Sequence, residues 1–119
     1  MKMLSLCARH FLAMAALLAL WSSSLAWAAG SAATDQAKQT WQLLDYLAVD
    51  YGGAVSDGKV QSASEYEEMK EFAATAAHQL AALPSTPALP DLQRQATALS
   101  KLIAAKADSK AVADSAHSL

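Results

Sequence analysis

The chain has 119 residues, with 9 Lys and Arg against 11 Asp and Glu, so its formal charge is −2. An acidic balance of this kind argues against nucleic acid and against anionic lipid as partners. The single cysteine, Cys7, lies near the N-terminus and the sequence contains no C-x-x-C-H motif, so we expect neither disulfides nor covalently attached haem in the rest of the chain.

Residues 1–28 have the pattern of a secretory signal peptide. A basic start leads into an apolar stretch, Phe11 to Trp21, which is shorter than the roughly 20 residues that a spanning helix needs. Ala26-Trp27-Ala28 is a small-x-small cleavage site, so we expect cleavage after Ala28 and export to the periplasm. The alternative is that the segment stays uncleaved and anchors the protein in the membrane. Cleavage would leave a domain of residues 29–119 with no cysteine.

The first predicted helix begins at Thr34 or Asp35, either of which can serve as an N-cap. Its apolar side chains recur with the alternating three- and four-residue spacing of a bundle helix, at Trp41, Leu44, Ala48, Tyr51 and Val55. Leu43 and Leu47 lie off this stripe, so the helix is apolar on more than one face. Gly52-Gly53 weakens its last turn, and Asp57-Gly58 is expected to close it with a left-handed residue or turn.

The second predicted helix starts at a capping box formed by Ser62 and Glu65. Its apolar positions have regular helical spacing, at Tyr66, Met69, Ala73, Ala76, Leu80 and Leu83. A connector with three prolines follows, and it cannot be helical throughout because proline lacks a backbone N–H.

A third helix is expected to begin at Asp91, with apolar positions Leu92, Ala96, Leu99 and Ile103. A break at Asp108-Ser109 offers a new N-cap for a fourth helix. That helix reaches Leu119 without a residue that would end it, which indicates either a fraying end or the front part of a longer protein.

The sequence therefore predicts an all-α fold, a small antiparallel bundle of three to four helices, because no alternating β-branched run exceeds a few residues. The predicted core consists of Trp41, Leu44, Tyr66, Met69, Phe72, Leu80, Leu92, Leu99 and Ile103. Many interior positions carry alanine, so we expect a low total stability.

Acidic side chains are the candidates for a metal site. Asp45 lies at the edge of the first stripe, and Asp50 lies with Tyr46 on the opposite side. Carboxylate and phenolate oxygens are hard ligands of the kind that ferric iron favours. The second helix places further carboxylates one turn apart, at Glu65, Glu68 and Glu71, and a cation would offset their repulsion. A solvated outer face, with Lys70 offsetting part of the charge, is the alternative.

No other group of polar residues in the sequence predicts a metal site or an active site. Glu71 and His78 share a face but are two turns apart, roughly 10 Å at 1.5 Å per residue, so one ion cannot bridge them. The sequence contains no Ser-His-Asp order, Gly-rich phosphate loop or metal-hydrolase motif. We therefore expect no enzymatic activity.

One long stretch carries a family resemblance. Residues 40–76, TWQLLDYLAVDYGGAVSDGKVQSASEYEEMKEFAATA, resemble the exported N-terminal region of bacterial high-affinity iron permeases, which are relatives of the fungal permease that works with a ferroxidase. The likeness is weaker from Leu89 to Leu119, where it depends on an alanine-rich helical pair after the prolines.

The resemblance implies a role in iron uptake, but not the transport itself. Family members transport iron through a membrane domain whose R-E-x-x-E glutamates are the iron ligands. In this chain Glu67 stands where arginine would precede Glu68-Met69-Lys70-Glu71, and no run of about 20 apolar residues follows Ala29, so those ligand roles do not transfer. The haem-binding segment of some relatives is also missing.

Two functions follow as expectations. In the first, the domain binds iron ions weakly and relays them to a membrane permease part at the inner membrane, using Asp45, Asp50, Glu65, Glu68 and Glu71. In the second, it is a ligand-free helical docking domain in the periplasm, and the second apolar face of the first helix contacts the partner.

Overall fold

A computed structural model describes residues 30–119, so the predicted signal peptide and its cleavage site lie outside the described residues. Residues 30–54 are helical, and two short strands follow, β1 (Val55–Ser56) and β2 (Lys59–Val60). The remaining elements are α2 (Ala63–Ala81), α3 (Leu89–Ala104) and α4 (Ser109–His117). The chain divides into a unit of residues 1–34, of which only the helical residues 30–34 are described, and a unit of residues 35–119.

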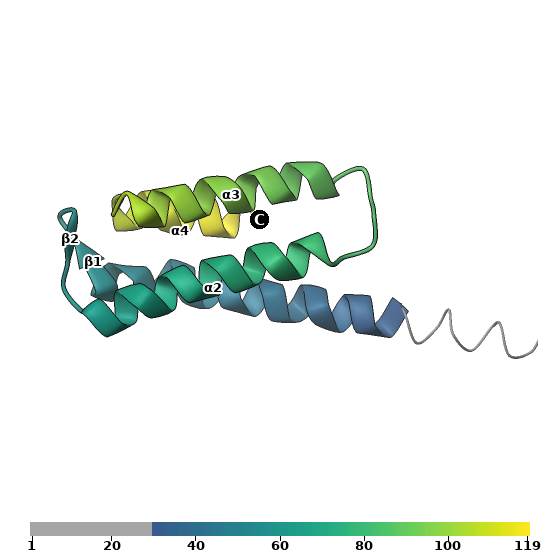
Figure 1. The fold of residues 1–119 in the computed structure, drawn as a ribbon, viewed down its shortest axis with the longest axis horizontal. Helices are drawn as coiled ribbons and strands as arrows, with labels where there is room; N and C mark the ends of the chain where they lie inside the picture. The colour runs from purple at the N-terminus through teal and green to yellow at the C-terminus, as the bar shows by residue number, and fades with distance from the viewer. Residues whose placement is uncertain (1–29) are drawn as a thin grey trace, which may run out of the picture. The chain divides into compact units, whose positions relative to one another are not determined.

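Within residues 35–119 the helices run back and forth as an antiparallel bundle (Figure 1). The all-α prediction is confirmed. Every helix of this unit contributes to one apolar core, whose buried members are Leu44, Leu47, Tyr51, Ala54, Val55, Met69, Ala73, Ala76, Leu99, Ile103, Val112 and Ala116. Four of these twelve side chains are alanine, so the helices approach closely and each contact removes little apolar surface from water.

The core prediction is confirmed in part. Five predicted members are buried, namely Leu44, Met69, Leu80, Leu99 and Ile103, and three are half-buried, namely Tyr66, Phe72 and Leu92. Trp41 is 62% exposed, so its assignment to the core was wrong.

The reason is the rotation of the first helix. Its buried face runs through Thr40, Leu44, Leu47 and Tyr51 rather than through Trp41 and Ala48. Thr40 can take the buried position because its hydroxyl lies 2.9 Å from the Gln36 carbonyl oxygen and 2.8 Å from Gln79 Oε1.

The predicted start of the first helix was also wrong. Residues 30–34 are already helical, so neither Thr34 nor Asp35 is an N-cap. Instead, the Thr34 hydroxyl donates a hydrogen bond to the Gly30 carbonyl oxygen at 3.0 Å, which is the back-bonding that threonine makes inside a helix.

The first helix ends in a tight β-hairpin. Asp57 and Gly58 both have positive φ, 52° and 69°, as a type I′ turn requires, and Val55 pairs with Val60. The predicted turn is confirmed, whereas the strands were not predicted, because two residues are too few to show alternation.

The starts of α2 and α3 agree with the sequence prediction to different degrees. Ser62 caps α2 by accepting a hydrogen bond from Glu65 N at 3.4 Å, which confirms its half of the predicted capping box. The Ser62 N–H is directed at the Ala54 carbonyl oxygen instead of the Glu65 side chain. In contrast, α3 begins at Leu89 rather than at Asp91 and has no side-chain cap. Pro90 is compatible with this earlier start, because N–H groups in the first turn of a helix have no partner within the helix. The N–H that proline lacks is therefore not missed there.

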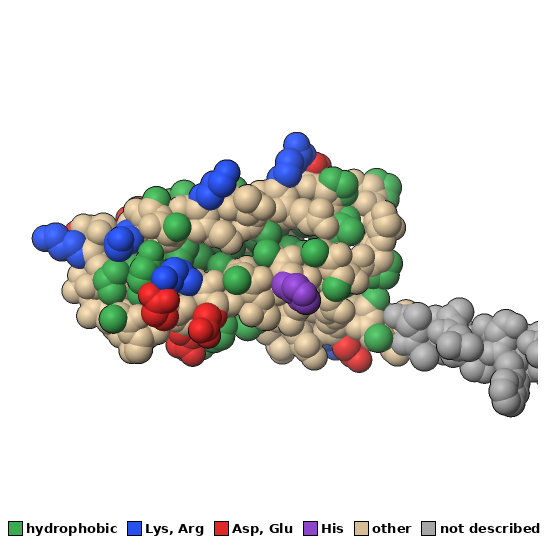
Figure 2. Space-filling view, viewed as in Figure 1, with side chains coloured by type: hydrophobic (Ala, Val, Ile, Leu, Met, Phe, Trp, Pro, Cys, Tyr) green, Lys and Arg blue, Asp and Glu red, His purple; other side chains and the backbone are tan. Residues whose placement is uncertain are grey.

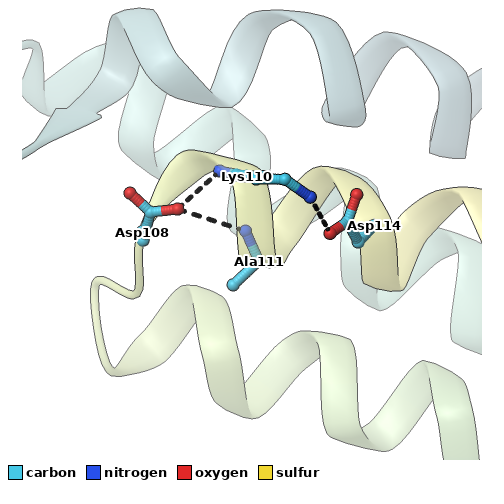
Figure 3. Close-up of polar contacts among 4 residues, drawn as sticks. All are labelled: Asp108, Lys110, Ala111 and Asp114. Atoms are coloured by element: carbon cyan, nitrogen blue, oxygen red, sulfur yellow. Dashed lines mark hydrogen bonds and ion pairs between the residues drawn. The ribbon is translucent and has the colours of Figure 1, made fainter.

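The predicted N-cap of α4 is confirmed. The Asp108 carboxylate accepts hydrogen bonds from Lys110 N at 2.9 Å and Ala111 N at 3.3 Å (Figure 3). One turn later, Lys110 Nζ lies 2.5 Å from the Asp114 carboxylate. These contacts stabilise a helix of only 9 residues, which is marginal by itself.

Two tyrosines hold the loop between α3 and α4. Tyr66 donates a hydrogen bond to the Ile103 carbonyl oxygen at 3.0 Å, and Tyr51 donates one to the Ala107 carbonyl oxygen at 3.1 Å. The two phenols therefore anchor the end of α3 and the loop before α4 to the rest of the bundle, and the Ile103 carbonyl also accepts a hydrogen bond from Lys106 N at 3.0 Å. Burial raises the pKa of Tyr51, which keeps its hydroxyl protonated as a donor.

Candidate functional site

A pocket of about 290 Å³ lies between the last turns of the first helix and the first turns of α2. We call it the acidic pocket, and it is lined by Tyr46, Val49, Asp50, Gly53, Glu65, Glu68 and Met69. Figure 2 shows acidic side chains gathered over the first half of α2. Three of the five predicted metal residues therefore line one pocket, from two helices that are adjacent in the bundle.

Helical spacing creates this arrangement. Tyr46 and Asp50 are one turn apart on the first helix, and Glu65 and Glu68 are one turn apart on α2. Gly53 contributes no side chain to the pocket, and a Cβ there would make an ordinary contact with Glu65 Oε2 at 3.5 Å.

The pocket has a negative potential that acts on Tyr46. The charge of Asp50 is the main cause that raises the pKa of Tyr46, and the charge of Glu68 is the next. Both carboxylates disfavour a second negative charge on the phenol oxygen. Among residues 30–119, Lys70 pairs with Glu67 at 2.7 Å, and no ion pair forms with Asp50, Glu65 or Glu68.

The remaining two predicted metal residues lie elsewhere. The Asp45 carboxylate is 3.6 Å from His117 Nε2 and so connects the first helix to α4. Glu71 is exposed and does not line the acidic pocket. In the part of the chain that the structure describes, no three His, Cys, Asp or Glu side chains are arranged to hold a metal ion. The acidic pocket is thus an open anionic surface without a preformed coordination sphere.

A second hollow of about 500 Å³ lies beside the acidic pocket, between the same two helices. We call it the apolar groove, and it is lined by Gln39, Gln42, Leu43, Tyr46, Phe72, Thr75 and Gln79. Tyr46 belongs to both hollows, and its ring meets Phe72 edge-on with centroids 5.3 Å apart. The sequence indicated a second apolar face at Leu43, but it did not show that Phe72 of α2 completes it.

Comparison with known protein families gives a match to the iron permease-associated 4-helix bundle domain over residues 28–119. The fold is a small helical bundle, and the chain belongs to this iron permease-associated 4-helix bundle family. The family resemblance of residues 40–76 is thereby confirmed. Comparisons with curated proteins and with solved structures gave no match. Within residues 30–119, no helix is long and apolar enough to cross a membrane.

Proposed function

We propose that the protein is an extracytoplasmic accessory module of an iron-uptake permease, in which the acidic pocket binds iron ions weakly and passes them to the membrane permease. Membership of the iron permease-associated family supports the context. The observation that carries the proposal is the convergence of Asp50, Glu65 and Glu68 on one pocket without a basic partner among residues 30–119. Location in the periplasm, at the inner membrane, is part of this proposal.

The chemistry of the pocket suits weak binding. Carboxylate and phenol oxygens are hard donors that accept iron, and a bound cation would relieve the repulsion between Glu65 and Glu68, a few tenths of a kcal/mol for a like-charged pair one turn apart. Because the three carboxylates do not form a closed coordination sphere, waters would complete the coordination, and the ion could leave easily. A relay needs such an exchangeable ion.

Calorimetric titration of the protein with ferrous iron, and with ferric iron kept soluble by a weak chelator, tests the proposal. We expect saturable, weak binding that is lost in a variant carrying Asp50→Asn, Glu65→Gln and Glu68→Gln. A matched control variant, Asp45→Asn with Glu71→Gln, removes carboxylates outside the pocket and should bind as the wild type does. Absence of heat and of thermal stabilisation in both oxidation states would contradict iron binding.

A second function, docking to a protein partner, is favoured by the apolar groove. Tyr46 is 46% exposed and Val49 is 71% exposed, although both lie on a helix whose opposite face is in the core. Exposed apolar side chains that adjoin a groove are typical of interaction surfaces. This function needs no iron.

A further inference from the structure

The acidic pocket and the apolar groove form one continuous surface because they share Tyr46. We call this surface the docking strip. On the first helix it extends from Gln39 to Gly53, which is roughly 20 Å at 1.5 Å per residue. One end presents Leu43 and Phe72, and the other presents Asp50, Glu65 and Glu68. The strip is therefore apolar at one end and negatively charged at the other.

The shape of the strip suits a helix. It lies in the furrow between two antiparallel helical segments, residues 35–54 and α2, which run side by side (Figure 1). A third helix fits such a furrow by placing a ridge of side chains into it, as amphipathic helices do in helix-in-groove recognition. The exposed amides of Gln39 and Gln42 beside the groove would contact the polar edge of that helix.

We propose that the docking strip binds a basic amphipathic helix of a partner protein. Its apolar side chains would cover Leu43 and Phe72, and a Lys or Arg would enter the acidic pocket. Asp50 follows Leu43 by seven residues, two helical turns or about 10 Å, so the basic residue of the partner should lie about two turns from its apolar anchor. Charge complementarity selects this occupant, since Asp50, Glu65 and Glu68 have no cationic partner within residues 30–119.

Two other occupants fit less well. A second copy of the chain would place its own docking strip against this one, so the acidic pocket would face either another acidic pocket or an apolar groove. Neither supplies a positive charge, and a desolvated carboxylate without a partner is costly. An anionic bilayer would be repelled by the same carboxylates.

The inference concerns the carboxylates that we assign to iron, but it requires no iron. A Lys or Arg in the acidic pocket would occupy the place of a weakly held cation, so docking and iron binding would exclude each other. The following test contains no metal, and the iron titration contains no partner, so either proposal can fail alone.

The probe is a synthetic helical peptide of about five turns with leucine on one face and lysine on the other. Two matched peptides replace lysine by glutamate or leucine by serine. Fluorescence anisotropy should detect binding of the Leu/Lys peptide to the purified protein, with both matched peptides at least about tenfold weaker, because each lacks the partner for one end of the strip.

Two pairs of variants localise the binding. Glu68→Lys should weaken it about tenfold or more, whereas Glu71→Lys, with the same change of net charge outside the strip, should weaken it less than about twofold. Leu43→Ser should weaken it severalfold, whereas Trp41→Ser, an exposed apolar position on the same helix outside the strip, should not. Thermal melting of each variant checks its folding.

Several outcomes would overturn the proposal. One is the absence of binding by the Leu/Lys peptide. Another is an equal loss in both members of a variant pair, which would indicate attraction by net charge or by any exposed apolar residue. Equal binding of the Leu/Glu peptide, or sedimentation of the protein with vesicles of anionic phospholipid, would show that the surface takes a different occupant.

Discussion

Tyr46 connects the two hollows of the surface, and its phenol responds to the charge in the acidic pocket. Its ring packs against Phe72 in the apolar groove, while its hydroxyl is subject to the potential of Asp50 and Glu68. A change of charge in the acidic pocket should therefore change the pKa of Tyr46.

Asp50→Asn should lower the pKa of Tyr46 toward its ordinary value of 10.0, because the largest cause of its rise is removed. Titration of the tyrosine Cζ signals by NMR measures the change. Asp45→Asn, on a different side of the helix, is the control and should leave the pKa of Tyr46 in place. An identical Tyr46 titration in wild type and Asp50→Asn would show that the carboxylate and the phenol are not close.

The same shift has a consequence for stability at high pH. A folded-state pKa raised above the unfolded value means that the native state holds its proton longer, so the contribution to stability is present below the unfolded pKa and is lost as the pH rises through the folded pKa. For Tyr46 and Tyr51 this window begins near pH 10.0. We expect urea unfolding to become easier above that pH, with a smaller loss in Asp50→Asn.

Leu47 distinguishes the observed core from the stripe that the sequence predicted. It is fully buried, although the predicted stripe passed through Ala48. Leu47→Ala should lower the free energy of unfolding by about 2–5 kcal/mol, because it leaves a cavity among the helices. Val49→Ala, at a position that is 71% exposed, should change it by less than about 0.5 kcal/mol. Urea denaturation measures both, and equal effects would contradict the observed rotation of the first helix.

Residue types alone could not resolve that rotation. Leu44 and Tyr51 belong to both possible stripes, and the choice between them depends on Thr40, whose burial is possible only because Gln36 and Gln79 satisfy its hydroxyl. The partner Gln79 lies on α2, 39 residues away, so no local pattern contains this information. The exposure of Trp41 follows from the same rotation.

At the scale of elements, the hairpin between the first helix and α2 depends on one glycine. A Cβ on Gly58 would meet no atom within 4 Å, so the positive φ of 69° is the obstacle to another residue. Gly58→Ala should destabilise the protein by about 1–2 kcal/mol. Gly53→Ala is the matched change in a helical position, where the added Cβ makes ordinary contacts, and it should stabilise by up to about 1 kcal/mol. Thermal melting should show shifts of opposite sign.

The short helix α4 depends on its N-cap. Asp108→Ala should cost about 1 kcal/mol, because Lys110 N and Ala111 N lose their acceptor. Asp108→Asn keeps an acceptor oxygen and should restore most of the stability. Hydrogen exchange of the α4 amides measures the local effect, and unchanged protection in Asp108→Ala would show that packing of Val112 and Ala116 alone holds this helix.

α2 was predictable from its long apolar spacing together with the Ser62 cap, and the short helix α4 was predictable mainly from its N-cap, Asp108. The start of α3 was not, because Ala88 gives no cap signal and Pro90 suits a first turn as well as a connector. The two-residue strands are fixed by the Asp57-Gly58 turn and are too short for any periodic signal.

At the scale of the whole molecule, the acidic pocket results from pairing two helices. The sequence predicted the carboxylates of each helix as candidates. It could not show that Asp50 joins Glu65 and Glu68 while Asp45 does not, because this depends on which faces the two helices present to each other. The structure separates them, with Asp45 next to His117 and Asp50 in the pocket. The family match and the pocket together support an accessory role in iron uptake.

The initial rate of iron uptake by cells that produce the protein together with an iron permease tests this role most directly. We predict a severalfold lower rate when Asp50→Asn, Glu65→Gln and Glu68→Gln are combined, at an unchanged level of folded protein. The matched variant Asp45→Asn with Glu71→Gln should take up iron at the wild-type rate. A wild-type rate in the triple variant, or an equal loss in both variants, would contradict a function of the acidic pocket in iron uptake.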